Sequence, residues 1–83
     1  MPETSADLGE ELAELVRAMV DHPDEVEVWE APEGRTVRLE LAVDPEDLGK
    51  VIGRQGRTAR AFRTLTAIAG LKQRRRLILE IVE

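Results

Sequence analysis

The sequence predicts an α+β fold in which helices cover one face of a three-stranded mixed sheet. Apolar residues recur every three or four positions near the N-terminus, which is typical of an amphipathic helix. Apolar and polar residues alternate in the middle of the chain and again near its end, as they do in half-buried strands. Between these two strands lies a helical stretch that glycines interrupt. The expected order is helix, strand, strand, helix, helix, strand, over residues 8–20, 26–30, 36–43, 45–52, 57–70 and 77–82.

The first helix is expected to lie on the sheet through one apolar stripe, with Glu10, Glu14 and Arg17 on its opposite side. Pro23 ends it, because a proline disfavours helical geometry at the preceding residue, His22. The stripe consists of Leu8, Leu12, Leu15, Val16, Met19 and Val20.

The first two strands are expected to form a hairpin, because Pro32 and Gly34 provide a turn between them. Two helices separate the second strand from the third, and a crossover of this length favours parallel pairing. Trp29 is the only tryptophan of the chain. We expect it to pack against the fold, or alternatively to contact a partner, since tryptophan is enriched at binding hot spots.

The second helix begins with two well-placed residues: Asp44 can cap it, and Pro45 suits its first turn. Gly70 is expected at the C-cap of the third helix. The residues expected to face the core are Leu48, Val51 and Ile52 in the second helix and Phe62, Leu65, Ile68 and Ala69 in the third, with Arg57, Arg60 and Arg63 facing solvent.

The length of 83 residues predicts one small domain over 1–83, with residues 1–6 frayed. The chain has no cysteine, which excludes disulfides and thiolate metal sites and fits a reducing cytoplasm. No apolar run approaches the roughly 20 residues of a membrane span, and the acidic N-terminus does not resemble a signal peptide. We therefore expect a soluble cytoplasmic protein.

The formal net charge of −5 hides an asymmetry between the two halves of the chain. Residues 1–48 contain 15 acidic and three basic side chains, a net charge of −12. Residues 49–83 contain two acidic and nine basic side chains, a net charge of +7. The second half is therefore the part expected to attract a polyanion.

The stretch "GKVIGRQGRTAR", residues 49–60, joins glycines to basic side chains between the last two helices. Gly53 and Gly56 bracket a sharp turn, and the missing side chains let a phosphate backbone approach closely. The third helix begins at this turn, so its free N–H groups and dipole favour an anion there. Its surroundings suit single-stranded nucleic acid: Lys50, Arg54, Arg57 and Arg60 supply charge, and Val51 and Ile52 supply an apolar floor for unstacked bases.

At "VIGRQGR" the sequence resembles K-homology (KH) domains, whose GxxG loop clamps about four nucleotides. The order of elements is similar to the type II form of the KH fold. The longer run "GKVIGRQGRTARAFRTL" resembles the KhpA family, formerly YlqC, of small bacterial single-domain KH proteins. The resemblance implies an RNA clamp formed by Gly53, Arg54, Gln55 and Gly56 beside Lys50, Val51, Ile52 and Arg57, and a second basic jaw formed by Lys72, Arg74, Arg75 and Arg76.

The resemblance also implies a biological setting. KhpA-like proteins are regarded as RNA chaperones or post-transcriptional regulators. They form homodimers, and heterodimers with a larger KH protein, KhpB (also called Jag or EloR), and they are linked to cell length and peptidoglycan homeostasis. We therefore expect single-stranded RNA as the ligand, and a second copy or a KhpB/Jag-type protein as the partner.

Two other functions remain open from the residues alone. Two helices joined by a glycine-containing turn also occur in helix-turn-helix DNA binders. The second of the two helices expected here, residues 57–70, contains no Asn or Gln that could contact base edges. A KH fold can also serve as a protein-interaction module without RNA binding. Catalysis has little support, since the chain has one histidine, His22, one serine, Ser5, no cysteine and no phosphate-binding Gly-Lys-Ser/Thr motif. We expect no enzyme, no metal and no cofactor.

Overall fold

A computed structural model describes residues 5–83, with side chains from Leu8 onward. The order of elements is α1 (Ser5–Arg17), β1 (Glu27–Glu33), β2 (Thr36–Ala42), α2 (Leu48–Ile52), α3 (Arg57–Lys72) and β3 (Arg76–Ile81), with three short 3₁₀ turns at Pro23–Glu25, Pro45–Asp47 and Arg54–Gly56. The predicted α+β order is confirmed. The expected fraying of residues 1–6 concerns a stretch whose first four residues lie outside the described part.

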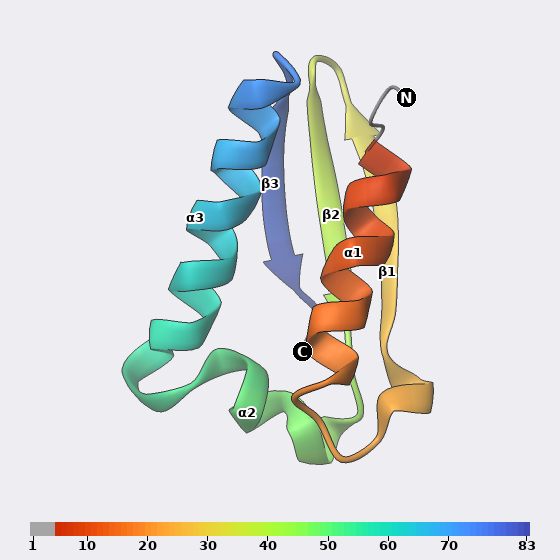
Figure 1. Ribbon diagram of the computed structural model, residues 1–83, viewed down its shortest axis with the longest axis vertical. Helices are drawn as coiled ribbons and strands as arrows, with labels where there is room; N and C mark the ends of the chain where they lie inside the picture. Colours follow the sequence, from red (N-terminus) through yellow and green to blue (C-terminus); the bar gives the residue numbers. More distant parts are fainter. Residues whose placement is uncertain (1–4) are drawn as a thin grey trace.

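The sheet has the strand order β1-β2-β3 (Figure 1). β1 pairs antiparallel with β2 as a hairpin, and β2 pairs parallel with β3, as the crossover through α2 and α3 predicts. α1 packs on β1 and α3 packs on β3 on the same side of the sheet. The three strands thus form one layer and the helices a second layer.

The core lies between these two layers. Alternate residues of β2 and β3 are buried there: Val37, Leu39 and Leu41 of β2, and Leu77, Leu79 and Ile81 of β3. Leu39 and Leu41 have no exposed surface. The strand periodicity predicted from the sequence is therefore the periodicity of burial.

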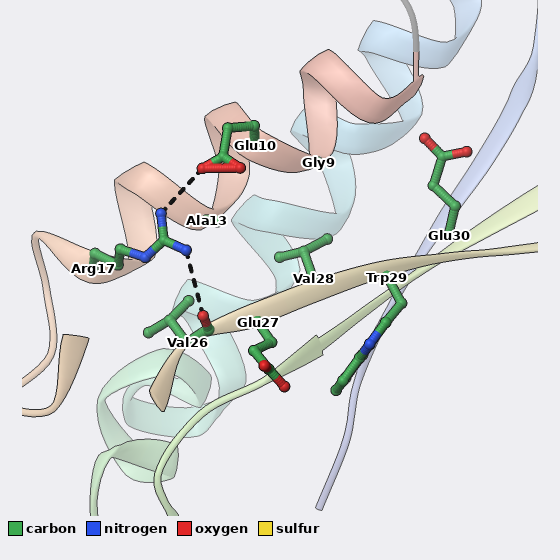
Figure 2. A pocket seen from close by; sticks show the side chains of 9 residues that line it. All are labelled: Gly9, Glu10, Ala13, Arg17, Val26, Glu27, Val28, Trp29 and Glu30. Carbon is green, nitrogen blue, oxygen red and sulfur yellow. Dashed lines mark hydrogen bonds and ion pairs between the residues drawn. The ribbon is translucent and has the colours of Figure 1, made fainter. Parts of the chain in front are cut away.

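The opposite face of the sheet is open and carries a charged cluster. Arg38 pairs there with Glu33, Glu40 and Glu80 at N–O distances of 3.0, 3.1 and 3.2 Å. Trp29 lies opposite Glu40 in the ladder and is 46% exposed, while the preceding Val28 packs against the core. Figure 2 shows these two side chains on opposite sides of β1. Trp29 therefore faces away from the core with about half of its surface exposed, so packing on the open face and contact with a partner both stay predictions.

The helices differ from the prediction in which residues they bury. Leu15 and Met19 of the expected first stripe are exposed, as are Leu65 and Ile68 of the expected third stripe. The stripe that α3 buries is Ala59, Phe62, Thr66 and Gly70.

Gly70 explains why α3 buries a different face from the one predicted. It is not the C-cap of the helix but a residue inside it that contacts β3. A Cβ at Gly70 would lie 2.6 Å from the carbonyl oxygen of Arg75 and 3.0 Å from Cγ of Leu77. The missing side chain brings the end of α3 close to β3, and the helix continues to Lys72. This close approach decides which face of α3 points inward.

One predicted helix boundary is confirmed and another is shifted. Asp44 caps the segment before α2 as predicted, since its Oδ1 accepts a hydrogen bond from the N–H of Glu46 at 2.9 Å. α1 ends at Arg17, three residues before the predicted end, because the chain tightens into a turn in which the N–H of Met19 bonds the carbonyl of Val16. Within residues 5–83, none of the helices combines the length and apolarity that crossing a membrane requires.

Candidate nucleic-acid interface

The turn between α2 and α3 has a backbone that requires glycine at Gly53. This residue has φ 78° and ψ 170°, a region open almost only to glycine. A Cβ there would lie 2.3 Å from Oγ1 of Thr58 and 2.9 Å from its backbone nitrogen. Gly53 is therefore required for the turn itself, before any ligand is considered.

Gly56 has a different role, because space is open around it. Its φ of 74° and ψ of 14° are left-handed helical, and the atom nearest to an added Cβ would be Nη1 of Arg60 at 4.0 Å. Gly56 is also the N-cap of α3, and having no side chain it cannot cap the N–H groups of the first turn. The N–H of Arg57 already donates to the carbonyl oxygen of Arg54, and an anion that reaches the turn meets the positive end of the α3 dipole.

Three arginines surround this helix start: Arg54, Arg57 and Arg60, all exposed. Gln55 occupies the tip of the turn with φ 57° and accepts a hydrogen bond from Nη2 of Arg57 at 3.2 Å. The predicted clamp residues are therefore together in space, at the end of the molecule where α2 meets α3 (Figure 1). An exposed, positively charged turn at a helix start is suited to a phosphodiester backbone.

Lys50 lies beside this turn, but its ammonium is held by acidic side chains. Nζ is 2.5 Å from Oδ2 of Asp21 and 3.6 Å from Oδ1 of Asp47. The hydrogen bond to Asp21 raises the pKa of Lys50. The positive charge of Lys50, which was expected to act on a phosphate, is thus already compensated by acidic side chains within the fold.

The expected apolar floor consists of less surface than the sequence indicated. Val51 has no exposed surface and belongs to the core. Ile52 is half-buried, so of these two residues only Ile52 can offer surface to a base.

The expected second jaw lies at the opposite end of α3 from the GxxG turn (Figure 1). α3 has 16 residues, so its ends are about 24 Å apart. Lys72 lines a hollow against Leu8 and Glu11 of α1, whereas Arg74, Arg75 and Arg76 line a hollow against β3. The structure therefore does not bring these four residues to the clamp, and it places Lys72 on a different flank from the arginines.

A buried carboxylate, Asp47, supports the turn from behind. The buried carboxylate of Asp47 accepts hydrogen bonds from the N–H groups of Asp21 and His22 at 3.1 and 2.9 Å. This anchors the loop after α1 to the start of α2. The run "DPED" signals a helix start, but nothing local indicates which of its three acids is buried.

A separate hollow of about 350 Å³ lies between α1 and β1 (Figure 2). Arg17 spans one side of it, with Nη1 3.1 Å from Oε1 of Glu10 and Nη2 3.5 Å from the carbonyl oxygen of Val26. Glu27 and Glu30 also line it, so its charge does not suit a polyanion.

One group of side chains in the described part of the chain has the composition of a metal site. His22, Asp44 and Glu46 place ligand atoms within 4.8 Å of one another. The imidazole already lies between two carboxylates, with Nδ1 3.1 Å from Asp47 and Nε2 3.4 Å from Glu46. Within this group His22 pairs with Glu46, and Asp44 accepts a hydrogen bond from the backbone of Glu46.

Several known proteins are similar to this chain over most of its length. The family model "KhpA/KhpB, KH domain" matches residues 10–81. The RNA-binding protein KhpA of Caldanaerobacter subterraneus is 49% identical over 90% of this chain and all of its own length. The KhpA proteins of Halalkalibacterium halodurans and Aquifex aeolicus are 49% and 51% identical over 83% and 81% of this chain, and over 91% and 85% of their own lengths. No solved structure matches the chain.

Proposed function

Because this chain belongs to the KhpA/KhpB family of KH domains, we propose that it binds single-stranded RNA at the turn Gly53–Gly56. The observation that carries the proposal is the combination at one exposed point of a glycine turn, an uncapped helix start and three arginines. The relatives named above are RNA-binding proteins, which supports RNA as the ligand.

The binding mode follows from the geometry of the turn. Phosphates approach the backbone at Gly56, where a side chain is absent, and lie at the positive end of the dipole of α3. The guanidinium groups of Arg54, Arg57 and Arg60 add charge-assisted hydrogen bonds. Ile52 offers the apolar surface nearest the turn for an unstacked base. Contacts of this kind are made mainly to the backbone, so we expect little sequence preference from them.

The proposal extends to the cellular role that the family resemblance implies. RNA binding would serve an RNA chaperone or post-transcriptional regulator in the cytoplasm, without enzymatic activity. Its partners would be a second copy or a KhpB/Jag-type KH protein, acting in cell-length and peptidoglycan homeostasis. The exposed side chains of Leu15 and Leu65, which line one hollow between α1 and α3, support a protein partner on that side of the fold.

Reversing the charge of the turn tests the proposal. In the double variant Arg54→Asp/Gln55→Asp, two carboxylates face the phosphates, while both positions are exposed and little packing is lost. We expect a normal melting temperature and no measurable binding of a short uridine oligonucleotide. Arg35→Asp, in the exposed turn between β1 and β2, adds two of the three negative charge units of the double variant at a position away from the turn, and this control should keep most of the binding. A folded double variant that binds RNA normally would remove this turn from the function.

A further inference from the structure

The hollow between the end of α3 and β3 combines an apolar floor with a cationic rim. Its volume is about 560 Å³, and it is lined by Ala67, Leu71, Leu77, Ile78, Arg74, Arg75 and Arg76. Leu71 is 76% exposed and Ile78 is 43% exposed. Large exposed aliphatic side chains that share a hollow with arginines indicate a ligand that has both an apolar plane and negative charge.

This hollow lies on the same flank of α3 as part of the clamp. Arg60, Ala67 and Leu71 are spaced by seven and four residues, which places them on one stripe of a helix. The opposite flank of α3 faces α1, since Leu65 lines one hollow there and Lys72 another. A strand that leaves the turn past Arg60 therefore reaches the hollow without crossing the helix.

We propose that this hollow is a second nucleotide subsite, which takes a base of the same RNA strand on Leu71 and Ile78 and its phosphates on the arginines of the rim. The proposal rests on the proposed RNA binding at Gly53–Gly56 and extends it. Bases in single strands bind apolar surfaces and guanidinium planes with little sequence preference, because every base has a π-face.

The charge of the rim decides between this occupant and a second copy of the chain. In a two-fold symmetric contact the same patch meets itself, so Arg74 and Arg76 of the two copies would be brought together. Like charges opposed across an interface are unfavourable. A polyanion instead neutralises them.

The distance between the two sites sets the RNA length that engages both. Arg57 and Leu71 are 14 residues apart along α3, which corresponds to about 21 Å. At the stacked spacing of about 3.4 Å per phosphate, this is about six nucleotides beyond a clamp of about four. A tetranucleotide therefore occupies only the turn, and a dodecanucleotide reaches the hollow.

The test compares the affinities of uridine oligonucleotides of four and twelve residues for two serine variants of exposed aliphatic residues. Leu71→Ser alters the hollow, and Val82→Ser, at a position 43% exposed after the end of β3, is the control. We expect Leu71→Ser to weaken binding of the dodecamer about fivefold or more and to leave the tetramer unchanged. Val82→Ser should leave both affinities unchanged. A variant that binds through the turn alone fits the dodecamer in more registers than the wild type, which reduces the observed loss, so the tetramer affinity of the same variant is the reference.

The other outcomes separate this inference from the proposed function. If Leu71→Ser leaves both affinities unchanged, or if both serine variants weaken the dodecamer equally, the subsite is overturned while binding at the turn stands. If Leu71→Ser changes only the molecular mass of the free protein by light scattering, the hollow is a self-association face and the proposal is likewise overturned. If the wild-type protein binds neither oligonucleotide, the proposed function itself fails. Circular dichroism of each variant establishes that it is folded.

Discussion

Nδ1 of His22 lies 3.1 Å from Oδ2 of Asp47, a carboxylate with no exposed surface, although the two residues are 25 positions apart in the chain. The backbone N–H of His22 bonds the same oxygen at 2.9 Å. This pair joins the loop after α1 to the start of α2, and α2 leads directly into the glycine turn. The position of the proposed clamp therefore depends on a contact that is remote from it in sequence.

The His22–Asp47 pair predicts a dependence of stability on pH. The hydrogen bond to Asp47 raises the pKa of His22, and the nearby carboxylates of Asp44 and Glu46 act in the same direction. Because this pKa is raised, protonated His22 stabilises the fold. The stabilisation is complete below the ordinary histidine pKa of about 6.5 and is lost as pH rises through the pKa of His22 in the folded protein.

We therefore expect the melting temperature of the wild type relative to His22→Gln to be higher at about pH 5.5 than at about pH 8.5. Glutamine keeps an amide donor for Asp47 but has no charge to titrate. Thermal melts of both proteins across this range make the measurement, and an equal difference at the two pH values would contradict the prediction.

The carboxylate of Asp47 titrates in the opposite sense. Burial by itself would raise its pKa, but the N–H groups of Asp21 and His22 together with the imidazole outweigh burial, so the pKa of Asp47 is lowered. The contribution of ionised Asp47 to stability is present above the ordinary aspartate pKa and is lost as pH falls through the pKa of Asp47 in the folded protein. Asp47→Asn should therefore unfold at a lower temperature than the wild type at neutral pH and show a smaller further loss on acidification.

Asp21 is predicted to weaken RNA binding by holding Lys50. In Asp21→Asn the ammonium loses its partner at 2.5 Å and can turn toward a phosphate. We expect tighter binding of a tetranucleotide and a slope of log affinity against log salt that is steeper by about 0.7, the value for one more phosphate contact on a single strand. Asp24→Asn, in the same loop, makes the same change in net charge and should leave the slope unchanged.

The two glycines of the turn are predicted to differ in stability. Gly53→Ala combines a conformation open almost only to glycine with a contact on Thr58, so we expect it to cost about 3 kcal/mol or more of the free energy of unfolding. Gly56→Ala meets open space and only the left-handed conformation, a cost of about 1–2 kcal/mol. Urea denaturation measures both. Equal losses would mean that the turn relaxes around Thr58.

Salt dependence tests how many cations the clamp uses. With Lys50 held by Asp21, the arginines Arg54, Arg57 and Arg60 neutralise about three phosphates, which predicts a slope of about −2 for a tetranucleotide. Replacing Arg74, Arg75 and Arg76 by alanine should leave this slope unchanged and flatten the slope for a dodecanucleotide. A flatter slope with the tetranucleotide would contradict the separation of the two sites along α3.

Local patterns in the sequence predict much of this protein. The alternation in residues 36–43 specifies a strand with one buried face, and the glycines at 53 and 56 specify a turn between two helices, because these features depend on neighbouring residues alone. The family resemblance and the excess of positive charge after Leu48 indicate the same ligand.

Only the tertiary structure decides which of these residues meet. The pairing of Lys50 with Asp21 joins positions 29 apart in the chain, and the burial of Val51 depends on the whole core. The close approach of Gly70 to β3 rotates α3, so that Leu65 and Leu71 are exposed on opposite flanks. Helical periodicity gives the width of an apolar stripe but not its orientation, because orientation is set by the contacts of the helix with strands distant in sequence.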